Sequence, residues 1–246
     1  MRKVRTYSEL ADFVRAFKTK QIGLLIIVSR AGLGKTSIVG QELESPLILN
    51  SVITPLEFYK ALARKVSDEK DCLIVIDEAE LMFQNSKIKT MLKALCDTQV
   101  EKTITYTSST PLLEDLPKEV VTEAKVIILI NTLTPRDAHL KAILNRGHVI
   151  RFEPNGNEIC NYLSSWAKDK EILNFIKGCQ NNNLTLRTYV KALEEKQAGL
   201  NWRALVIGDL EIKNKDVVKS IARIKNVTER QAQRIVRQLG LEEIFA

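Results

Sequence analysis

The sequence contains little from which a metal centre or a disulfide framework could be built. Its 246 residues include two histidines and four cysteines, and no two cysteines form a CxxC pair. Zinc sites and redox dithiols depend on closely spaced thiols and imidazoles. Only His139 and His148 could complete a zinc site with the cysteines. We therefore expect reduced, partly buried thiols at positions 72, 96, 160 and 179.

Long apolar runs are also absent. The longest, residues 22–28 and 126–130, are far shorter than the roughly 20 residues that a membrane-spanning helix needs. The basic residues 1–5 are followed by an amphipathic stretch rather than by the apolar core of a signal peptide. We expect a cytoplasmic protein with no membrane partner.

The composition is typical of a soluble globular protein, because 45% of the residues are hydrophobic, 27% are charged, and glycine and proline number only 10 and 6. Fibrous and disordered classes are thereby excluded. The length predicts one large domain, or a medium-sized one with small appendages. A formal net charge of +7 favours polyanionic partners such as nucleic acid. Many proteins of this size are basic only because they have solvated lysine faces. The charge alone therefore does not show that the protein binds nucleic acid.

Four short apolar runs predict buried strands of a parallel sheet. They are residues 22–28, 46–49, 72–76 and 125–130. Helical patterns accompany them. Ser8 is the expected N-cap of a helix to about residue 20, Thr54 and Pro55 begin a second helix, and residues 86–96 form a third. Strands that alternate with helices indicate an α/β sandwich.

Beyond residue 155 the pattern becomes entirely helical. The expected helices are residues 158–168, 170–177 and 185–198. We predict an α/β core over residues 1–154, an all-helical lid over residues 155–208 and a small C-terminal helical module over residues 209–246.

A glycine-rich loop, SRAGLGKTS, follows the first predicted strand. It approaches the phosphate-loop pattern GxxxxGK followed by Ser or Thr, with serine in place of the first glycine. Glycine lets the backbone turn tightly around phosphate, and amides at the start of the next helix bind anions. We expect Lys35 to bind the β and γ phosphates and the Thr36 hydroxyl to bind Mg²⁺. The expected nucleotide-binding residues are Ser29, Arg30, Ala31, Gly32, Leu33, Gly34, Lys35, Thr36 and Ser37.

Two carboxylates, Asp77 and Glu78, end the predicted strand at residues 72–76. Parallel sheets bind ligands at the carboxyl ends of their strands, where the phosphate loop is also expected. Asp77 is the expected Mg²⁺ ligand, and Glu78 the general base that activates water. The alternative is a helix N-cap with a favourable dipole contact.

The order of these motifs resembles AAA+ ATPases of phage and mobile-element replication, with some likeness to superfamily 3 helicases. After the phosphate loop and the acidic pair come an apolar strand ending at Asn131 and the segment LNRGHVIRFEP at residues 144–154. The resemblance covers roughly residues 20–200. It implies a P-loop sandwich followed by a helical lid, with ATP and Mg²⁺ as ligands.

The resemblance also implies three further roles. Asn131 would be the sensor 1 residue that places the attacking water, and Arg187 the sensor 2 arginine. Arg146 would be an arginine finger that acts on a neighbouring subunit, so hydrolysis would require an oligomer. Each residue also has a structural alternative. Asn131 could be a turn-forming asparagine and Arg187 an ordinary surface arginine. Arg146 could be a helix-end arginine that interacts with the helix dipole.

Two segments lie outside this scheme. Residues 102–109 alternate with period 2 and predict an extra strand that could approach the pore of a ring. Residues 213–246 predict two short helices joined at 226–228, with the spacing of a helix-turn-helix. Arg230, Arg234 and Arg237 recur there at helical spacing and could contact DNA. A plain two-helix packing element is the alternative.

The sequence therefore predicts a Mg²⁺-dependent ATPase that works in a homo-oligomeric ring or filament to remodel or translocate on DNA. A replication helicase, a helicase loader and a transposition or replication factor all fit, with a replication or mobile-element protein as a further partner. An ATP-driven remodeller of protein assemblies is the alternative. A nucleotide kinase or GTPase-like switch would need an acceptor-binding or guanine-reading motif, which we do not find.

Overall fold

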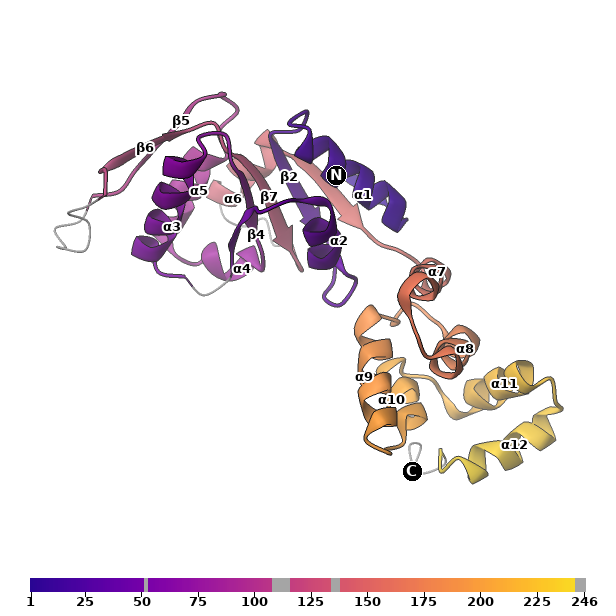
Figure 1. Cartoon of the computed structure of the whole chain (residues 1–246). Helices are drawn as coiled ribbons and strands as arrows, with labels where there is room; N and C mark the ends of the chain where they lie inside the picture. Colours follow the sequence, from indigo (N-terminus) through magenta and orange to yellow (C-terminus); the bar gives the residue numbers. More distant parts are fainter. Residues whose placement is uncertain (51–52, 108–115, 134–137, 242–246) are drawn as a thin grey trace. The chain divides into compact units, whose positions relative to one another are not determined.

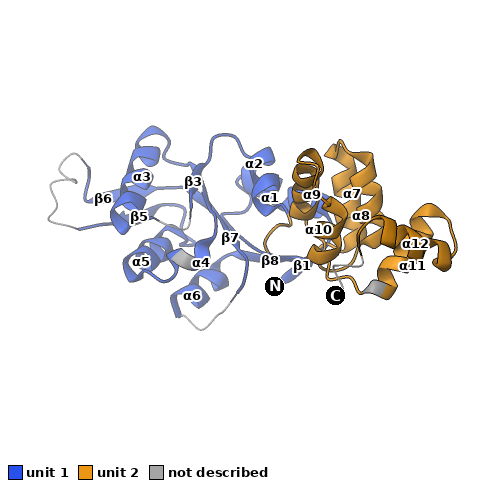
Figure 2. Cartoon of the chain, turned by 90° about the horizontal axis from the view of Figure 1, so that it is seen from below, with its two compact units in different colours: residues 1–30, 34–153 blue, residues 31–33, 154–246 orange. Residues whose placement is uncertain are grey.

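The computed structural model describes residues 1–50, 53–107, 116–133 and 138–241. The chain forms two compact units, shown in two colours in Figure 2. The first contains residues 1–30 and 34–153, and the second contains residues 31–33 and 154–246. The predicted boundaries at residues 154 and 208 stay predictions.

A six-stranded, entirely parallel sheet forms the centre of the first unit (Figure 1). The strand order is β1-β8-β2-β7-β4-β3. The strands are β1 (Arg2–Val4), β2 (Leu24–Val28), β3 (Leu47–Leu49), β4 (Leu73–Ile76), β7 (Lys125–Ile130) and β8 (His148–Phe152). The four predicted apolar runs supply β2, β3, β4 and β7, so the predicted parallel sheet is confirmed.

The central strands are buried on both faces. Every residue of β2 is buried, and so are the last five residues of β7. Successive side chains of a strand point to opposite faces. Continuous apolar runs are therefore what a sheet covered by helices on both sides requires.

The helices described in the first unit are α1 (Tyr7–Lys18), α2 (Lys35–Glu42), α3 (Pro55–Asp68), α4 (Ala79–Met82), α5 (Ser86–Leu95) and α6 (Ala138–Arg146). Thr54 caps α3 as expected, with Pro55 in its first turn. The expectation that Ser8 caps the first helix is wrong. Thr6 is the N-cap, because its hydroxyl accepts the N–H of Glu9 and the Glu9 carboxylate accepts the N–H of Thr6, which forms a capping box.

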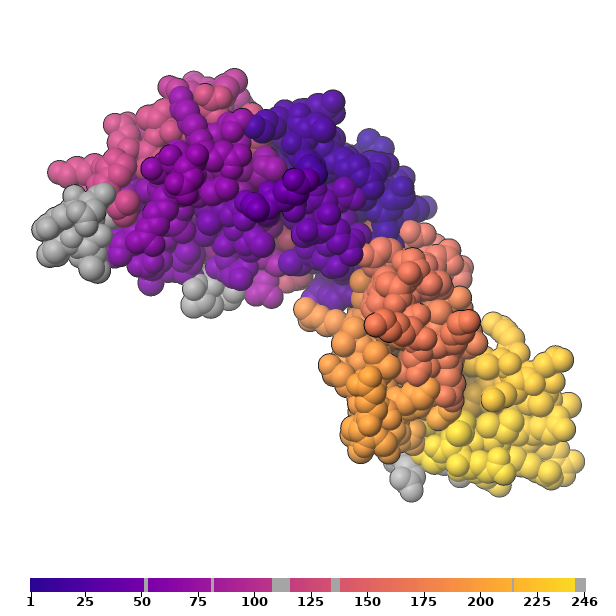
Figure 3. All heavy atoms as spheres, in the orientation of Figure 1, coloured from indigo at the N-terminus to yellow at the C-terminus, as the bar shows by residue number. Residues whose placement is uncertain are grey.

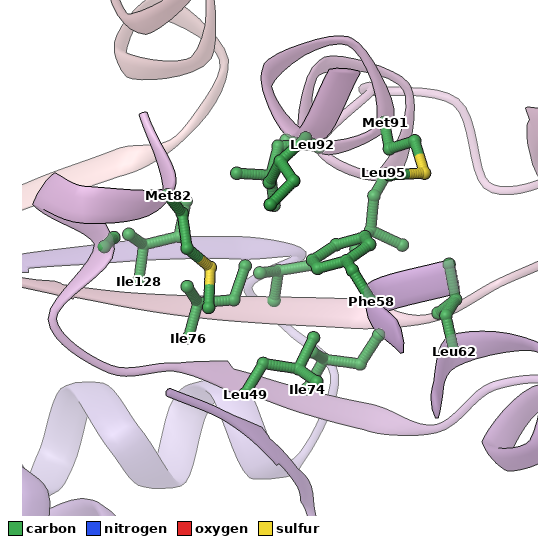
Figure 4. Packing of buried hydrophobic residues seen from close by; sticks show 14 of the residues in the cluster. Leu49, Phe58, Leu62, Ile74, Ile76, Met82, Met91, Leu92, Leu95 and Ile128 are labelled. Atoms are coloured by element: carbon green, nitrogen blue, oxygen red, sulfur yellow. The ribbon is translucent and has the colours of Figure 1, made fainter. Parts of the chain in front are cut away.

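The main core lies between the sheet and the helices α3 to α6. Figure 4 shows Phe58 of α3 and Leu95 of α5 gathered over Ile74 and Ile76 of β4, with Met82 of α4 beside them. All five side chains are almost completely buried. This packing holds α4, which follows the acidic pair, against the sheet.

A separate antiparallel hairpin lies between α5 and β7 in the sequence. It consists of β5 (Lys102–Thr105) and β6 (Glu119–Thr122). The strand predicted at residues 102–109 is thus present over its first half. Tyr106 continues the pairing through a hydrogen bond from its N–H to the Lys118 carbonyl. Residues 108 and 109 of the predicted strand lie outside the described residues.

The second unit is helical. Its helices are α7 (Gly156–Trp166), α8 (Lys170–Cys179), α9 (Leu186–Gln197), α10 (Trp202–Asp209), α11 (Asn214–Lys225) and α12 (Glu229–Gln238). Helix α11 packs on α8, where Gly178 leaves room for Ile224 because a Cβ at residue 178 would overlap that side chain. Helix α11 of the predicted C-terminal module therefore packs against α8 of the predicted lid.

All four cysteines are free and buried, whereas the sequence predicted partly buried thiols. In the described ranges, no cluster of three or more His, Cys, Asp or Glu side chains is arranged to hold a metal ion. None of the helices in those ranges has the length and apolarity that crossing a bilayer requires.

Candidate nucleotide-binding site

The glycine-rich loop connects β2 to α2 at the carboxyl edge of the sheet. Gly32 and Gly34 have φ angles of 79° and 83°, in the left-handed region that side chains disfavour. Gly34 is the N-cap of α2 and has no side chain with which to cap the first N–H groups of that helix. Those groups, from Lys35, Thr36 and Ser37, suit an anion.

Serine is tolerated at the first position of the loop for a physical reason. The φ of Ser29 lies outside the left-handed region, so glycine is not required there. Its side chain is small enough to be buried, with an exposed fraction of 3%. Its N–H donates to the Ile130 carbonyl, which ties the start of the loop to the end of β7.

Residues Ala31, Gly32 and Leu33 group with the second unit. The Gly32 carbonyl accepts a 2.9 Å hydrogen bond from the N–H of Leu186, the first residue of α9. A Cβ on Gly32 would lie 3.1 Å from Thr185 Cβ and 3.4 Å from Arg187 Cδ. Arg187, the expected sensor 2 residue, is therefore placed beside the phosphate loop, in the first turn of a helix capped by Thr185 as predicted.

Lys35 is buried and its ammonium group is held by three oxygens. Nζ donates to the carbonyls of Ser29, at 2.5 Å, and Arg30, at 3.2 Å. It also donates to Asn131 Oδ1 at 2.9 Å, which joins the loop to the end of β7. The residue expected to bind phosphate and the residue expected to place water are thus in direct contact.

The two expected metal ligands are also in contact. The Thr36 hydroxyl donates a 2.7 Å hydrogen bond to Asp77 Oδ2. A hydroxyl and a carboxylate are the oxygen ligands that Mg²⁺ prefers. Thr36 is exposed and Asp77 partly exposed, so both oxygens can be reached from solvent. The donor set fits a Mg²⁺ ion bound together with substrate phosphates.

Glu78 occupies a constrained turn between β4 and α4. Its φ of 51° is in the left-handed region, which costs a non-glycine residue of order 1 kcal/mol or more. Its N–H donates to Asp77 Oδ1 at 2.9 Å, which stabilises the turn. The side chain is exposed, as a base that must reach a water molecule requires.

Glu80 is a residue of this site that the sequence did not reveal. It lies in the first turn of α4, and its Oε1 accepts hydrogen bonds from the backbone N–H groups of Asn131 and Thr132, the latter at 3.1 Å. It therefore fixes the backbone that carries the Asn131 side chain. Its position three residues after Asp77 was the available signal, but an acidic residue early in a helix is common for dipole reasons.

Arg146 lies apart from this group. It is in the last turn of α6, where Nη1 donates to the Lys93 carbonyl at 2.9 Å and Nη2 lies 3.3 Å from Asp97 Oδ2. Its hydrogen-bond and ion-pair partners among the described residues belong to α5 and the turn after it. The structure therefore places Arg146 with Asp97 and does not bring it to the phosphate loop.

Comparison with known proteins identifies the fold. No protein-family model and no curated protein matches the chain. Among solved structures, it is similar to RuvB of Thermotoga maritima, described as a Holliday junction branch migration motor, with 13% identity over 95% of this chain and 80% of that chain and a TM-score of 0.51. A variant of the same protein gives 12% identity over 96% and 81%, with a TM-score of 0.52. The chain has the P-loop NTPase fold with a helical C-terminal part.

In this P-loop fold, three neighbouring strands supply the site. The loop after β2 carries Lys35 and Thr36, β4 ends at Asp77, and β7 ends at Asn131. Since β7 pairs with both β2 and β4, the three strand ends lie side by side. The arrangement offers a cation, a metal-binding oxygen pair, an exposed carboxylate and an amide at one edge of the sheet.

Proposed function

We propose that this protein is a Mg²⁺-dependent ATPase that hydrolyses ATP in a homo-oligomer and uses the energy to remodel or translocate on DNA. The supporting observation is the convergence of Lys35, Thr36, Asp77 and Asn131, linked by the hydrogen bonds from Lys35 to Asn131 and from Thr36 to Asp77. Phosphoryl transfer needs positioning and charge stabilisation above all, and these residues supply both.

Binding of the phosphates begins with the loop. The N–H groups at the start of α2 and the Lys35 ammonium face the negative charge. To bind phosphate oxygens, Lys35 must give up part of its contact with the Ser29 and Arg30 carbonyls. Mg²⁺ held at Thr36 and Asp77 would neutralise charge on the β and γ phosphates.

Hydrolysis is assigned to residues at the neighbouring strand ends. Glu78 accepts the proton of the attacking water, because its carboxylate is exposed beside Asp77. The amide of Asn131 orients that water, since an amide both donates and accepts hydrogen bonds. Arg187 contacts the γ phosphate from its place beside Gly32.

Arg146 acts on the nucleotide of a neighbouring subunit in this proposal. Within one chain it is engaged by Asp97 and the Lys93 carbonyl. Catalysis therefore depends on assembly into a ring or filament, in which Arg146 exchanges these partners for a phosphate across the interface.

DNA is the proposed substrate for two reasons. The chain carries a formal net charge of +7, which attracts phosphate polymers. The AAA+ structure that it resembles over 95% of its length is a DNA branch migration motor. Replication or mobile-element partner proteins fit the same proposal, and a phage-type replication factor or helicase loader is the finer assignment.

The test is the ATPase rate of the full chain with Mg²⁺, measured without DNA, with single-stranded DNA and with duplex DNA. Lys35→Ala is the matched control for contaminating activity. We expect hydrolysis that needs Lys35 and is stimulated by DNA. If the parent hydrolyses ATP no faster than Lys35→Ala, the ATPase proposal is overturned. Hydrolysis that is indifferent to both DNA forms, without DNA binding, would favour a remodeller of protein assemblies instead.

A further inference from the structure

Helix α12 has two chemically distinct faces. Ala232 and Val236 are buried, while Arg230, Gln233, Arg234 and Arg237 are exposed. At 100° per residue, the four exposed side chains fall within an arc of about 100°, whose centre lies about 130° around the helix from the buried pair. We call this set the α12 basic face. It contains three guanidinium groups and one amide, and no acidic residue.

Some arginines elsewhere in the chain are neutralised by ion pairs. Arg15, Arg146 and Arg203 each form an ion pair with an acidic side chain. Arg230 and Arg234 have no ion pair with any residue that the structure describes. From residue 211 onward, eight Lys or Arg residues stand against five Asp or Glu residues. Arg230 and Arg234 therefore offer charge that no acidic side chain within the described ranges neutralises by an ion pair.

The connection between the last two helices presents this face in a defined orientation. Helix α11 ends at Asn226, whose φ of 53° is in the left-handed region, and Thr228 caps α12 through a capping box with Gln231. The turn is thus three residues long. Helix α11 is anchored by buried Val217 and Ile221 and by the contact of Ile224 with Gly178 of α8. The yellow part of the surface in Figure 3 contains both helices.

We infer that the α12 basic face binds duplex DNA by entering the major groove. A single helix fits that groove, and helix-turn-helix pairs place their second helix in it. Planar guanidinium groups suit both phosphate oxygens and the O6 and N7 acceptors of guanine, and a glutamine side chain suits the N6 and N7 edge of adenine. The inference rests on the proposed DNA-directed function and deepens it by assigning the contacting surface.

The test compares full-length variants by fluorescence anisotropy with a short mixed-sequence DNA duplex. In the first variant, Arg230, Arg234 and Arg237 are all changed to Ala. The matched control changes Lys168, Lys170 and Lys177, which are exposed in the same unit, to Ala. Both lose three positive charges. Circular dichroism and the ATPase rate without DNA, expected to be unchanged in both, show that each variant is folded.

We expect the arginine variant to bind the duplex at least about 10-fold more weakly, and the log-log salt slope to fall by roughly 1 for each lost phosphate contact. The lysine control should keep the parental affinity within about threefold and keep its salt slope. Equal affinity and slope in the arginine variant and the parent, or equal losses in both variants, would overturn the inference and leave the ATPase intact. Failure of the parent itself to bind DNA would instead overturn the DNA-directed function.

Discussion

Glu80 accepts a 3.1 Å hydrogen bond from the backbone N–H of Thr132. The same carboxylate oxygen accepts the N–H of Asn131, whose side chain in turn accepts a hydrogen bond from Lys35. A chain of contacts thus runs from α4 through the end of β7 to the phosphate loop. Glu80 does not touch the phosphate-binding groups itself, so we assign it as a positioning residue for Asn131.

Removal of the Glu80 carboxylate should slow turnover without weakening nucleotide binding. We expect Glu80→Ala to lower kcat by roughly 10-fold, because two N–H groups lose a charged acceptor and Asn131 loses its fixed position. The dissociation constant for ATP should change less than about threefold. Glu80→Gln retains an acceptor oxygen and should recover part of the rate. Equal kcat in the alanine variant and the parent would remove Glu80 from the site.

Sequence patterns were sufficient to predict the strands in which nearly every residue is buried. Strands β2 and β4 are apolar at every position, and β7 is apolar after Lys125, because both faces of these strands are covered. The phosphate loop and acidic pair were equally visible, since their chemistry requires particular residues at fixed spacing. The sequence therefore predicted that Lys35, Thr36 and Asp77 lie at the same edge of the sheet, whereas their contacts come from the structure.

Features that depend on tertiary pairing were not visible in the sequence. Strand β1 has only three residues, of which Val4 alone is buried, and it exists because it pairs with β8. The role of Glu80 depends on α4 packing beside the end of β7, which no local pattern encodes. The contact of Arg146 with Asp97 likewise arises from the packing of α6 against α5. In contrast, the capping box at Thr6 and Glu9 was readable in the sequence.

Lys35 and Glu78 should have separable effects. Lys35→Ala removes the cation that contacts the phosphates and should abolish detectable ATP binding. Glu78→Gln keeps the loop intact but removes the base, so ATP should bind normally while kcat falls by about 10²- to 10⁴-fold. Binding is measured with a fluorescent ATP analogue and turnover by phosphate release. If Glu78→Gln hydrolyses ATP at the parental rate, Glu78 is not the base.

The hydroxyl of Thr36 should set the Mg²⁺ requirement. Thr36→Val keeps the shape of the side chain but leaves Asp77 as the only side-chain oxygen of the pair. We expect the Mg²⁺ concentration for half-maximal turnover to rise roughly 10-fold or more. Thr36→Ser retains the hydroxyl and should behave like the parent. The assignment is wrong if the valine and serine variants have the same Mg²⁺ dependence.

The buried thiols should resist alkylation. Burial raises the pKa of Cys96 to about 12 and those of Cys160 and Cys179 to about 11. The reactive thiolate is therefore scarce near pH 8, and access is blocked as well. Iodoacetamide should modify these residues only after unfolding, as seen by mass spectrometry. Rapid labelling of Cys96 in the folded protein at pH 8 would contradict the buried position.

Arg146 should affect stability slightly and turnover strongly. Its pair with Asp97 is partly exposed, so Arg146→Ala should lower the free energy of unfolding by only about 0.2–1 kcal/mol. As an arginine finger, the same change should lower kcat by about 10³-fold or more with ATP binding unchanged. Asp97→Asn is the control, because it weakens the ion pair but leaves the guanidinium available. A stability loss without any change in turnover would make Arg146 a helix-end structural residue.

Catalysis in trans gives the proposed oligomer its sharpest test. Arg146→Ala and Glu78→Gln subunits should each be nearly inactive alone, since every interface lacks either the finger or the base. In a mixture, some interfaces join the intact Arg146 of a Glu78→Gln subunit to the intact Glu78 of an Arg146→Ala subunit. Those interfaces should hydrolyse ATP, and the rate should pass through a maximum as the mixing ratio is varied. A mixture no more active than its components, although light scattering shows co-assembly, would refute action across the interface.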